Sequence, residues 1–190
     1  MKKQLKITVV KIINSFLKPK KFDLVIYDDI YPHPVSGFRL EEFTILLSTI
    51  KNSKILLNPI AYPIVNTDIK LHPIHVNQIT SNNLQLTGKL KPINRFVFFN
   101  SKLFYCIFIN NIYKVIDYLE ISQTPFVFTL YPGGGFQMYD IQSDLKLKRV
   151  LLSPMFKMVI VTQNITNLCG ASVPITKHFF AIPALINASA

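Results

Sequence analysis

The sequence is 190 residues long and 49% hydrophobic, which is enough for one domain with a packed core but excludes two full-sized domains of the nucleotide-binding type. Lysine and arginine number 21 against 10 aspartates and glutamates, so the formal net charge is +11. This charge favours an anionic partner, such as a nucleic acid, a phospholipid surface or a substrate that carries a diphosphate. The basic residues are scattered, however, and no zinc-finger, RRM or helix-turn-helix signature accompanies them, so we expect no nucleic-acid partner.

Residues 3–18 predict an amphipathic basic helix that ends at Pro19, because apolar residues recur at helical spacing with lysines around them. Lys6, Lys11 and Asn14 interrupt the apolar positions, so the segment lacks both the continuous core of a signal peptide and the length of a spanning helix. Two interpretations remain open. The apolar stripe packs against the domain, or the helix lies on an anionic membrane surface.

Beyond Pro19, apolar segments alternate with helical patterns. A first β-α-β unit comprises a strand at 23–28, a helix at about 38–51 and a strand at 54–60. Residues 61–95 are rich in proline and small polar residues, and they predict an irregular excursion with short strands at best. The alternation then resumes with strands at 104–109, 125–130, 157–162 and 178–183, and with helices at about 111–121, 143–152 and 164–169.

The strands are rich in Val, Ile and Phe and lack polar alternation, which is typical of strands buried on both faces in a parallel sheet covered by helices. The sequence therefore predicts one α/β domain over 1–190, with a Rossmann-like, mostly parallel sheet and helices on both faces. Cys106 and Cys169 lie far apart in or beside apolar runs, so we expect reduced cysteines in a cytoplasmic protein.

Polar loops follow several of these strands, where a doubly wound sheet binds its ligands. Three of the six glycines, Gly133, Gly134 and Gly135, follow the strand at 125–130. Glycines between a buried strand and a helix let backbone N–H groups face a ligand, and the helix N-terminus favours an anion. The alternative is a tight turn that binds nothing.

The loop after the first strand carries the candidate catalytic residues. Asp28 and Asp29 are adjacent, so in an extended segment they point to opposite sides and only one faces the cleft. Asp29 or His33 is expected to take a proton from a hydroxyl nucleophile. The alternative for each residue alone is a capping aspartate and a solvent-exposed histidine.

We expect neither a metal nor a cofactor. Asp68, His72 and His75 have spacings that suggest metal ligands, but they fall in the irregular stretch, where no helix aligns them. The GxGxxG, Walker lysine and GxSxG motifs are absent, which excludes the usual dinucleotide, phosphate-loop and serine-hydrolase assignments.

Three segments in order, "YDDIYPHPVSGFRLEEFTILL" (27–47), "PFVFTLYPGGGFQ" (125–137) and "DLKLKRVLLSPMFKMVIVTQNIT" (144–166), resemble the N-terminal half of bacterial GT-B-fold glycosyltransferases. Enzymes of this kind build capsule, O-antigen or other surface polysaccharides. In that family a loop with proline and glycine opens the first helix, as "PHPVSGFRLEEF" does here, and a strand leading to "VTQ" and a short helix follows later.

The resemblance implies a domain that binds a glycan or lipid-linked acceptor, while a C-terminal half holds the nucleotide sugar. The chain has about half the length of such an enzyme, so we expect a truncated or split transferase that is inactive without a separate donor-binding chain. Basic surfaces and the first helix fit peripheral attachment to the inner face of the cell membrane. The residues expected to line the cleft are Ser36, Gly37, Arg39, Gly133, Gly134, Gly135 and Gln163.

A second interpretation keeps the fold but not the catalysis. The chain would then be a glycan- or nucleotide-binding module, or a partner subunit of a separately encoded donor-binding chain. It predicts saturable binding without turnover.

Overall fold

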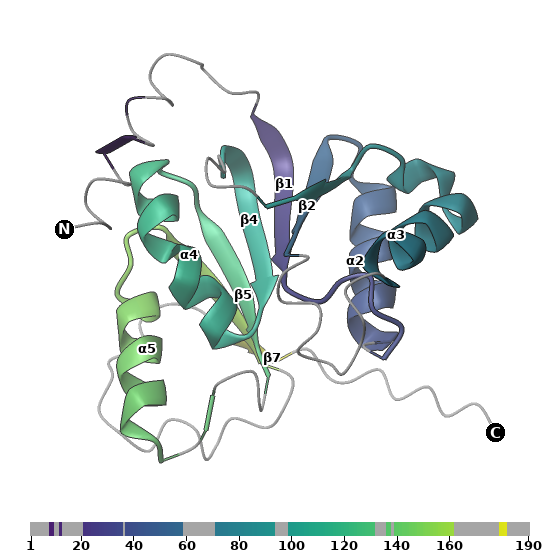
Figure 1. The fold of residues 1–190 in the computed structure, drawn as a ribbon. Helices are drawn as coiled ribbons and strands as arrows, with labels where there is room; N and C mark the ends of the chain where they lie inside the picture. The colour runs from purple at the N-terminus through teal and green to yellow at the C-terminus, as the bar shows by residue number, and fades with distance from the viewer. Residues whose placement is uncertain are drawn as a thin grey trace.

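The centre of the molecule is a parallel β-sheet, seen in a computed structural model of the chain (Figure 1). The structure describes residues 8, 9, 12, 21–35, 37–58, 71–93, 99–131, 136, 137, 139–161 and 179–181. Within them, seven strands form one sheet in the order β3-β2-β1-β4-β5-β6-β7, and every neighbouring pair is parallel. The strands are β1 (Phe22–Asp28), β2 (Ser53–Leu57), β3 (Leu90–Pro92), β4 (Ser101–Ile107), β5 (Phe126–Leu130), β6 (Phe156–Val161) and β7 (Phe179–Ala181).

Helices cover both faces of this sheet (Figure 1). They are α2 (Gly37–Thr49), α3 (Leu71–Asn82), α4 (Ile109–Ile121) and α5 (Ile141–Leu151), with a 3₁₀ turn η2 at Leu84–Leu86. The buried apolar residues of α4 and α5 share one core cluster with Val25 and Tyr27 of β1. The buried apolar residues of α2 share a second cluster with Leu24 and Ile26, on the other face. The predicted fold class, a Rossmann-like parallel sheet between helices, is confirmed.

The sequence explains why the strands are buried. All five residues of β5 and the last five of β1 are buried, as continuous apolar runs require when helices cover both faces. In α4, buried residues recur every three or four positions, which is the spacing of a single helix face. In α5, the Asp140 side chain accepts a hydrogen bond from the Ser143 backbone N at 2.8 Å and caps the helix.

The expected irregular excursion over 61–95 is wrong for the residues described there. Residues 71–82 form α3 and 90–92 form β3, so the segment contributes a helix and an edge strand to the fold. Pro73 is compatible with α3 because it lies in the first turn, where its missing N–H has no partner within the helix. Pro92 lies on the edge strand, which tolerates proline.

Other predicted elements differ from the structure mainly at their ends. The strand expected at 104–109 runs instead over Ser101–Ile107, because Phe108 has a φ of 76° and Ile109 begins α4. The apolar run continues without interruption into the helix, so hydrophobicity alone did not mark this boundary. The helix expected at 164–169 lies outside the described residues.

No helix in the described part of the chain is both long and apolar enough to cross a membrane. Of the predicted helix at 3–18, the structure describes Thr8, Val9 and Ile12, which are helical, and both apolar side chains are exposed.

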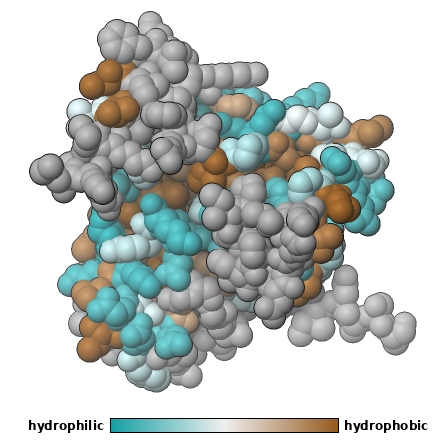
Figure 2. Space-filling view, viewed as in Figure 1, coloured by the Kyte–Doolittle hydropathy of each residue, from teal (hydrophilic) through white to brown (hydrophobic). Residues whose placement is uncertain are grey.

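On the face shown in Figure 2, hydrophilic and hydrophobic residues are interspersed. Cys106 is a free, buried cysteine, as expected, whereas Cys169 lies outside the described residues.

Candidate functional site

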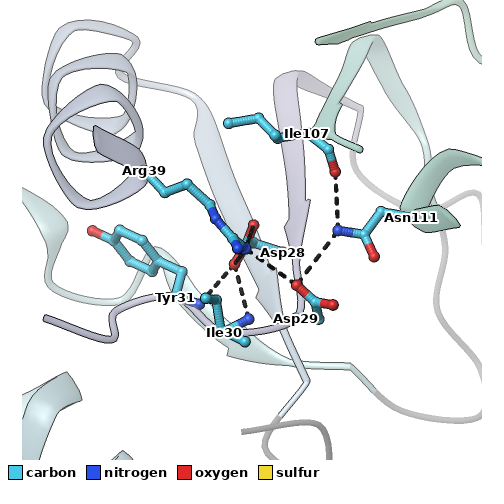
Figure 3. Close-up of polar contacts among 7 residues, drawn as sticks. All are labelled: Asp28, Asp29, Ile30, Tyr31, Arg39, Ile107 and Asn111. Carbon is cyan, nitrogen blue, oxygen red and sulfur yellow. Dashed lines mark hydrogen bonds and ion pairs between the residues drawn. The ribbon is translucent and has the colours of Figure 1, made fainter. Parts of the chain in front are cut away.

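A polar cluster lies where the order of strands reverses. From β1 the chain proceeds outward to β2 and β3, and it then returns to β4 on the other side of β1. The loops that follow β1 and β4 therefore leave the sheet toward opposite faces, and in doubly wound folds such a switch point forms the ligand crevice at the carboxyl ends of the strands. The polar residues at this switch point come from the end of β1, the N-terminal part of α2 and the start of α4 (Figure 3).

Asp28 ends β1 and is fully buried. Its Oδ1 accepts hydrogen bonds from the backbone N of Ile30 at 2.9 Å and of Tyr31 at 2.7 Å, which fixes the turn after the strand. Arg39 Nη1 donates to both carboxylate oxygens, at 3.1 and 2.9 Å. Burial raises the pKa of Asp28 above its ordinary value, while the Arg39 guanidinium and the backbone N–H of Ile30 act against that shift.

Asp29 lies at the same guanidinium. Its Oδ1 accepts from Arg39 Nη1 at 3.2 Å and, more weakly, from Asn111 Nδ2 at 3.5 Å. Asn111 also donates to the carbonyl oxygen of Ile107 at 3.0 Å, which ties the start of α4 to the end of β4. Figure 3 shows the Arg39 side chain pointing at Asp28 and Asp29. The expectation that the two aspartates point to opposite sides is therefore wrong, because the chain bends at Asp29 and strand alternation ends there.

Arg39 connects the polar cluster to an aromatic rim. Its guanidinium carbon lies 4.8 Å from the ring centroid of Phe108 and 5.9 Å from that of Phe38. Phe38 stacks on Tyr131, with centroids 5.0 Å apart and ring planes at 24°. The Arg39 side chain is only 10% exposed. In this structure Arg39 positions the two aspartates, and its expected place in the lining of a substrate cleft stays a prediction.

His33 is buried rather than exposed, so the solvent-exposed alternative is wrong. Its Nδ1 accepts a hydrogen bond from the Val35 backbone N at 3.1 Å, which places the proton of the neutral ring on Nε2. Burial, with a contribution from the nearby His75, lowers the pKa of His33. The two rings meet edge to face with centroids 5.7 Å apart.

Some expected cleft residues cannot be placed: Ser36, Gly133, Gly134, Gly135 and Gln163 lie outside the described residues. Gly37 is described as the first residue of α2, and a Cβ added there would meet nothing within 4 Å. The sequence reasoning also missed Phe108, Asn111 and Tyr131. Their position directly after β4 and β5 was the available signal, since parallel strands end at one edge of the sheet.

The two histidines whose spacing suggested metal ligands lie on a helix. His72 and His75 both lie on α3, contrary to the expectation that no helix aligns them, and Asp68 lies outside the described residues. Within the described part of the chain, no group of three or more histidine, cysteine or acidic side chains is arranged to hold a metal ion.

Fold and cluster together define a Rossmann-like α/β domain with a buried carboxylate–guanidinium cluster at its switch point. The chain matches no protein-family model, and comparisons with curated proteins and with solved structures likewise find no match.

Proposed function

We propose that this chain is the acceptor-side domain of a GT-B-type glycosyltransferase, which transfers a sugar from a nucleotide sugar to a hydroxyl of a glycan or lipid-linked acceptor. The observation that carries the proposal is the Asp29 carboxylate, held at the switch-point crevice by Arg39 and Asn111. The likeness of the segments at 27–47, 125–137 and 144–166 to such enzymes supports it.

Asp29 has the features of a general base. Its side chain is 22% exposed, and both of its bonds to side chains in the described part of the chain are made by Oδ1. Oδ2 can then accept the proton of an acceptor hydroxyl while the hydroxyl oxygen bonds to the anomeric carbon. The nucleoside diphosphate leaves with the electron pair of the broken C–O bond.

His33 is the weaker candidate for this role. Its Nδ1, the acceptor nitrogen of the neutral ring, is already bonded to the Val35 backbone N–H, and the ring is buried. A general base needs a free acceptor within reach of the hydroxyl. We therefore assign proton abstraction to Asp29 and a structural role to His33.

Genetic complementation tests the proposal whether the donor half lies on this chain or on another one. In a strain that lacks the gene, the wild-type protein should restore the surface polysaccharide seen on gels. Asp29→Asn keeps the size of the side chain but removes the base, and we expect transfer to fall by about 10²- to 10⁴-fold. Restoration should therefore fail with this variant.

Asp144→Asn is the matched control, because Asp144 is an exposed carboxylate in the first turn of α5, a helix that contributes no side chain to the polar cluster. It should complement like the wild type, and purified Asp29→Asn should melt at the same temperature as the wild type. Full restoration by Asp29→Asn would overturn the proposal and favour a non-catalytic binding module. An unchanged surface polysaccharide in the deletion strain would also overturn the proposal.

A further inference from the structure

A groove separate from the switch-point cluster lies between α2 and α3. Its volume is about 510 Å³, which falls within the range of small-ligand sites. On α2 it is lined by Leu40, Glu41 and Thr44, whereas Arg39 is buried in the polar cluster. At one end it reaches Gly37 and the prolines on either side of His33, so it adjoins the loop that carries Asp29.

The described lining of the groove is largely polar and includes one histidine, His75. Gln78, Asn82 and Asn83 contribute amides from α3 and the residue after it, and Glu41 contributes a carboxylate. No lysine or arginine is among the lining residues that the structure describes, although the chain as a whole has a net charge of +11. A phosphate or another anion would meet the Glu41 carboxylate and, among these described residues, no lysine or arginine, so this lining disfavours anionic ligands.

Several of these polar groups are available to a ligand. Asn83 Nδ2 donates to the Ile79 carbonyl at 3.2 Å, and Thr44 Oγ1 pairs with the Tyr31 hydroxyl at 3.0 Å. By contrast, the side chains of Gln78, Asn82 and Glu41 make no hydrogen bond within the described part of the chain. Amides both donate and accept, which suits the hydroxyl groups of a sugar.

Apolar side chains complete the match. Leu40 and Ile79 are half-buried and line the groove together with Pro32 and Pro34. A sugar ring has C–H faces that pack on such apolar surface and a rim of hydroxyl groups that bind amides and carboxylates. A wholly apolar ligand would leave the Gln78 and Asn82 amides without partners.

We propose that the groove between α2 and α3 binds a neutral oligosaccharide, the glycan part of the acceptor. This inference rests on the proposed function and narrows its acceptor class: recognition falls on uncharged sugar units, not on a lipid-linked diphosphate. The bound glycan would extend from the groove, past Gly37, toward the crevice that holds Asp29.

Gly37 provides a way to fill the groove without disturbing the fold. It lines the groove, and a Cβ added there would meet nothing within 4 Å. Gly37→Leu therefore adds bulk at the mouth of the groove, and leucine is a better helix former than glycine at the start of α2. Asn82→Ala removes one amide from the lining, and Asn77→Ala is its matched control on an exposed part of α3 that does not line the groove.

The probes are di- to tetrasaccharides of glucose, galactose, mannose and N-acetylglucosamine, with inorganic pyrophosphate as the anionic competitor. Binding to the full chain is measured by saturation-transfer NMR and calorimetry. We expect at least one neutral oligosaccharide to bind saturably, with affinity lowered about tenfold by Asn82→Ala, the scale of one lost hydrogen bond, and more by Gly37→Leu. Asn77→Ala should bind like the wild type, and pyrophosphate should not compete.

The inference is overturned if none of these oligosaccharides binds, if both groove variants bind like the wild type while remaining folded, or if pyrophosphate displaces the sugar. Its failure differs from failure of the proposed function. Asp29→Asn should retain oligosaccharide binding. If the groove binds sugar but Asp29→Asn complements fully, the protein has a glycan-binding site and the proposed transfer chemistry fails. Loss of complementation in Asp29→Asn without any sugar in the groove would leave the transferase without this subsite.

Discussion

At the scale of single residues, the buried pair of Asp28 and Arg39 is the most consequential contact in the molecule. Asp28 is fully buried, and Arg39 is buried as well. A buried ion pair contributes little net stability compared with apolar residues of similar size, because both charges lose their hydration. Removing only one partner is costly, because the other charge then stays buried without compensation. The pair therefore fixes the shape of the crevice more than it stabilises the fold.

Arg39→Met tests this view of the pair. It removes the cation and keeps much of the side-chain volume, so we expect the free energy of unfolding to fall by about 3 kcal/mol. Urea denaturation monitored by circular dichroism measures it. The double variant Asp28→Asn with Arg39→Met should recover part of the loss, because the unpaired charge is then gone. A single variant within about 0.5 kcal/mol of the wild type would show that the pair is dispensable.

At the scale of elements, most of the sheet could be predicted because its strands are continuous apolar runs. β1, β2, β5 and β6 were each expected within a few residues of their positions. α3 was missed because Pro73 was interpreted as a breaker and because the helix has only one buried residue, His72, so it lacks a clear apolar periodicity. A proline in a first turn and a proline in a helix interior look the same in a sequence.

The candidate site could be predicted only in part, for a related reason. Asp29 and Arg39 are close in sequence and were expected in one loop. Asn111 and Tyr131 reach the crevice only because β4 and β5 lie beside β1 in the sheet, and strand order cannot be deduced from a single chain. The bend at Asp29 also depends on the backbone bonds to Asp28, which strand alternation does not reveal.

Two buried histidines, His33 in the loop after β1 and His72 on α3, predict that the stability of the protein depends on pH. Burial lowers the pKa of His33 and of His72 from the ordinary value of 6.5. The unfolded chain therefore binds more protons than the folded one below about pH 6.5. The contribution of the neutral histidines to the free energy of unfolding is fully present above that pH. It is lost as the pH falls through their pKa values in the folded protein.

Thermal unfolding between pH 7.5 and pH 5 checks this. We expect the melting temperature to fall on acidification, and to fall less in the variant His33→Gln with His72→Gln, whose side chains do not titrate. The acidic groups are the same in both proteins, so their titration affects both melting curves alike. Parallel curves for the wild type and the variant would contradict the assignment.

The connection between α4 and α5 depends on Arg149. Its two terminal nitrogens donate to the two oxygens of Glu120, each at 2.7 Å, and Nη2 also donates to Asp117 at 3.0 Å. Arg149 is 38% exposed, so solvent weakens these bonds. We expect Arg149→Lys, which cannot form the paired bonds, to lower the free energy of unfolding by up to about 1 kcal/mol, and by less in high salt.

Urea denaturation at two salt concentrations measures the effect. Lys102→Ala is the control, because Lys102 makes a single ion pair with Asp23 between two exposed side chains. It should leave stability unchanged. An equal loss in both variants would mean that the paired geometry contributes nothing of its own.

At the scale of the whole molecule, the net charge of +11 is the property that reaches beyond any one site. Lysines within reach of an anionic bilayer each contribute about 1 kcal/mol of attraction, and this attraction is screened within a Debye length of about 10 Å at 0.1 M salt. Three lysines of the first segment, Lys2, Lys3 and Lys6, lie outside the described residues, so their contribution stays a prediction from the sequence.

Vesicle flotation tests this prediction. The protein should float with vesicles that contain phosphatidylglycerol and not with vesicles of phosphatidylcholine alone, and high salt should release it. Changing Lys2, Lys3 and Lys6 to Glu should reduce flotation strongly. Unchanged association of this variant would count against attachment through the N-terminal segment.

The place of β1 in the sheet also has a consequence for how the protein is made. β1 pairs with β2 soon after both are synthesised, but its other neighbour is β4, where Leu24 pairs with Leu103. A growing chain on the ribosome therefore exposes one edge of β1, an interior strand of the sheet, until β4 has emerged. Such late, distant pairing slows folding and leaves an apolar edge open to other chains. We expect nascent chains released before β4 to depend on chaperones.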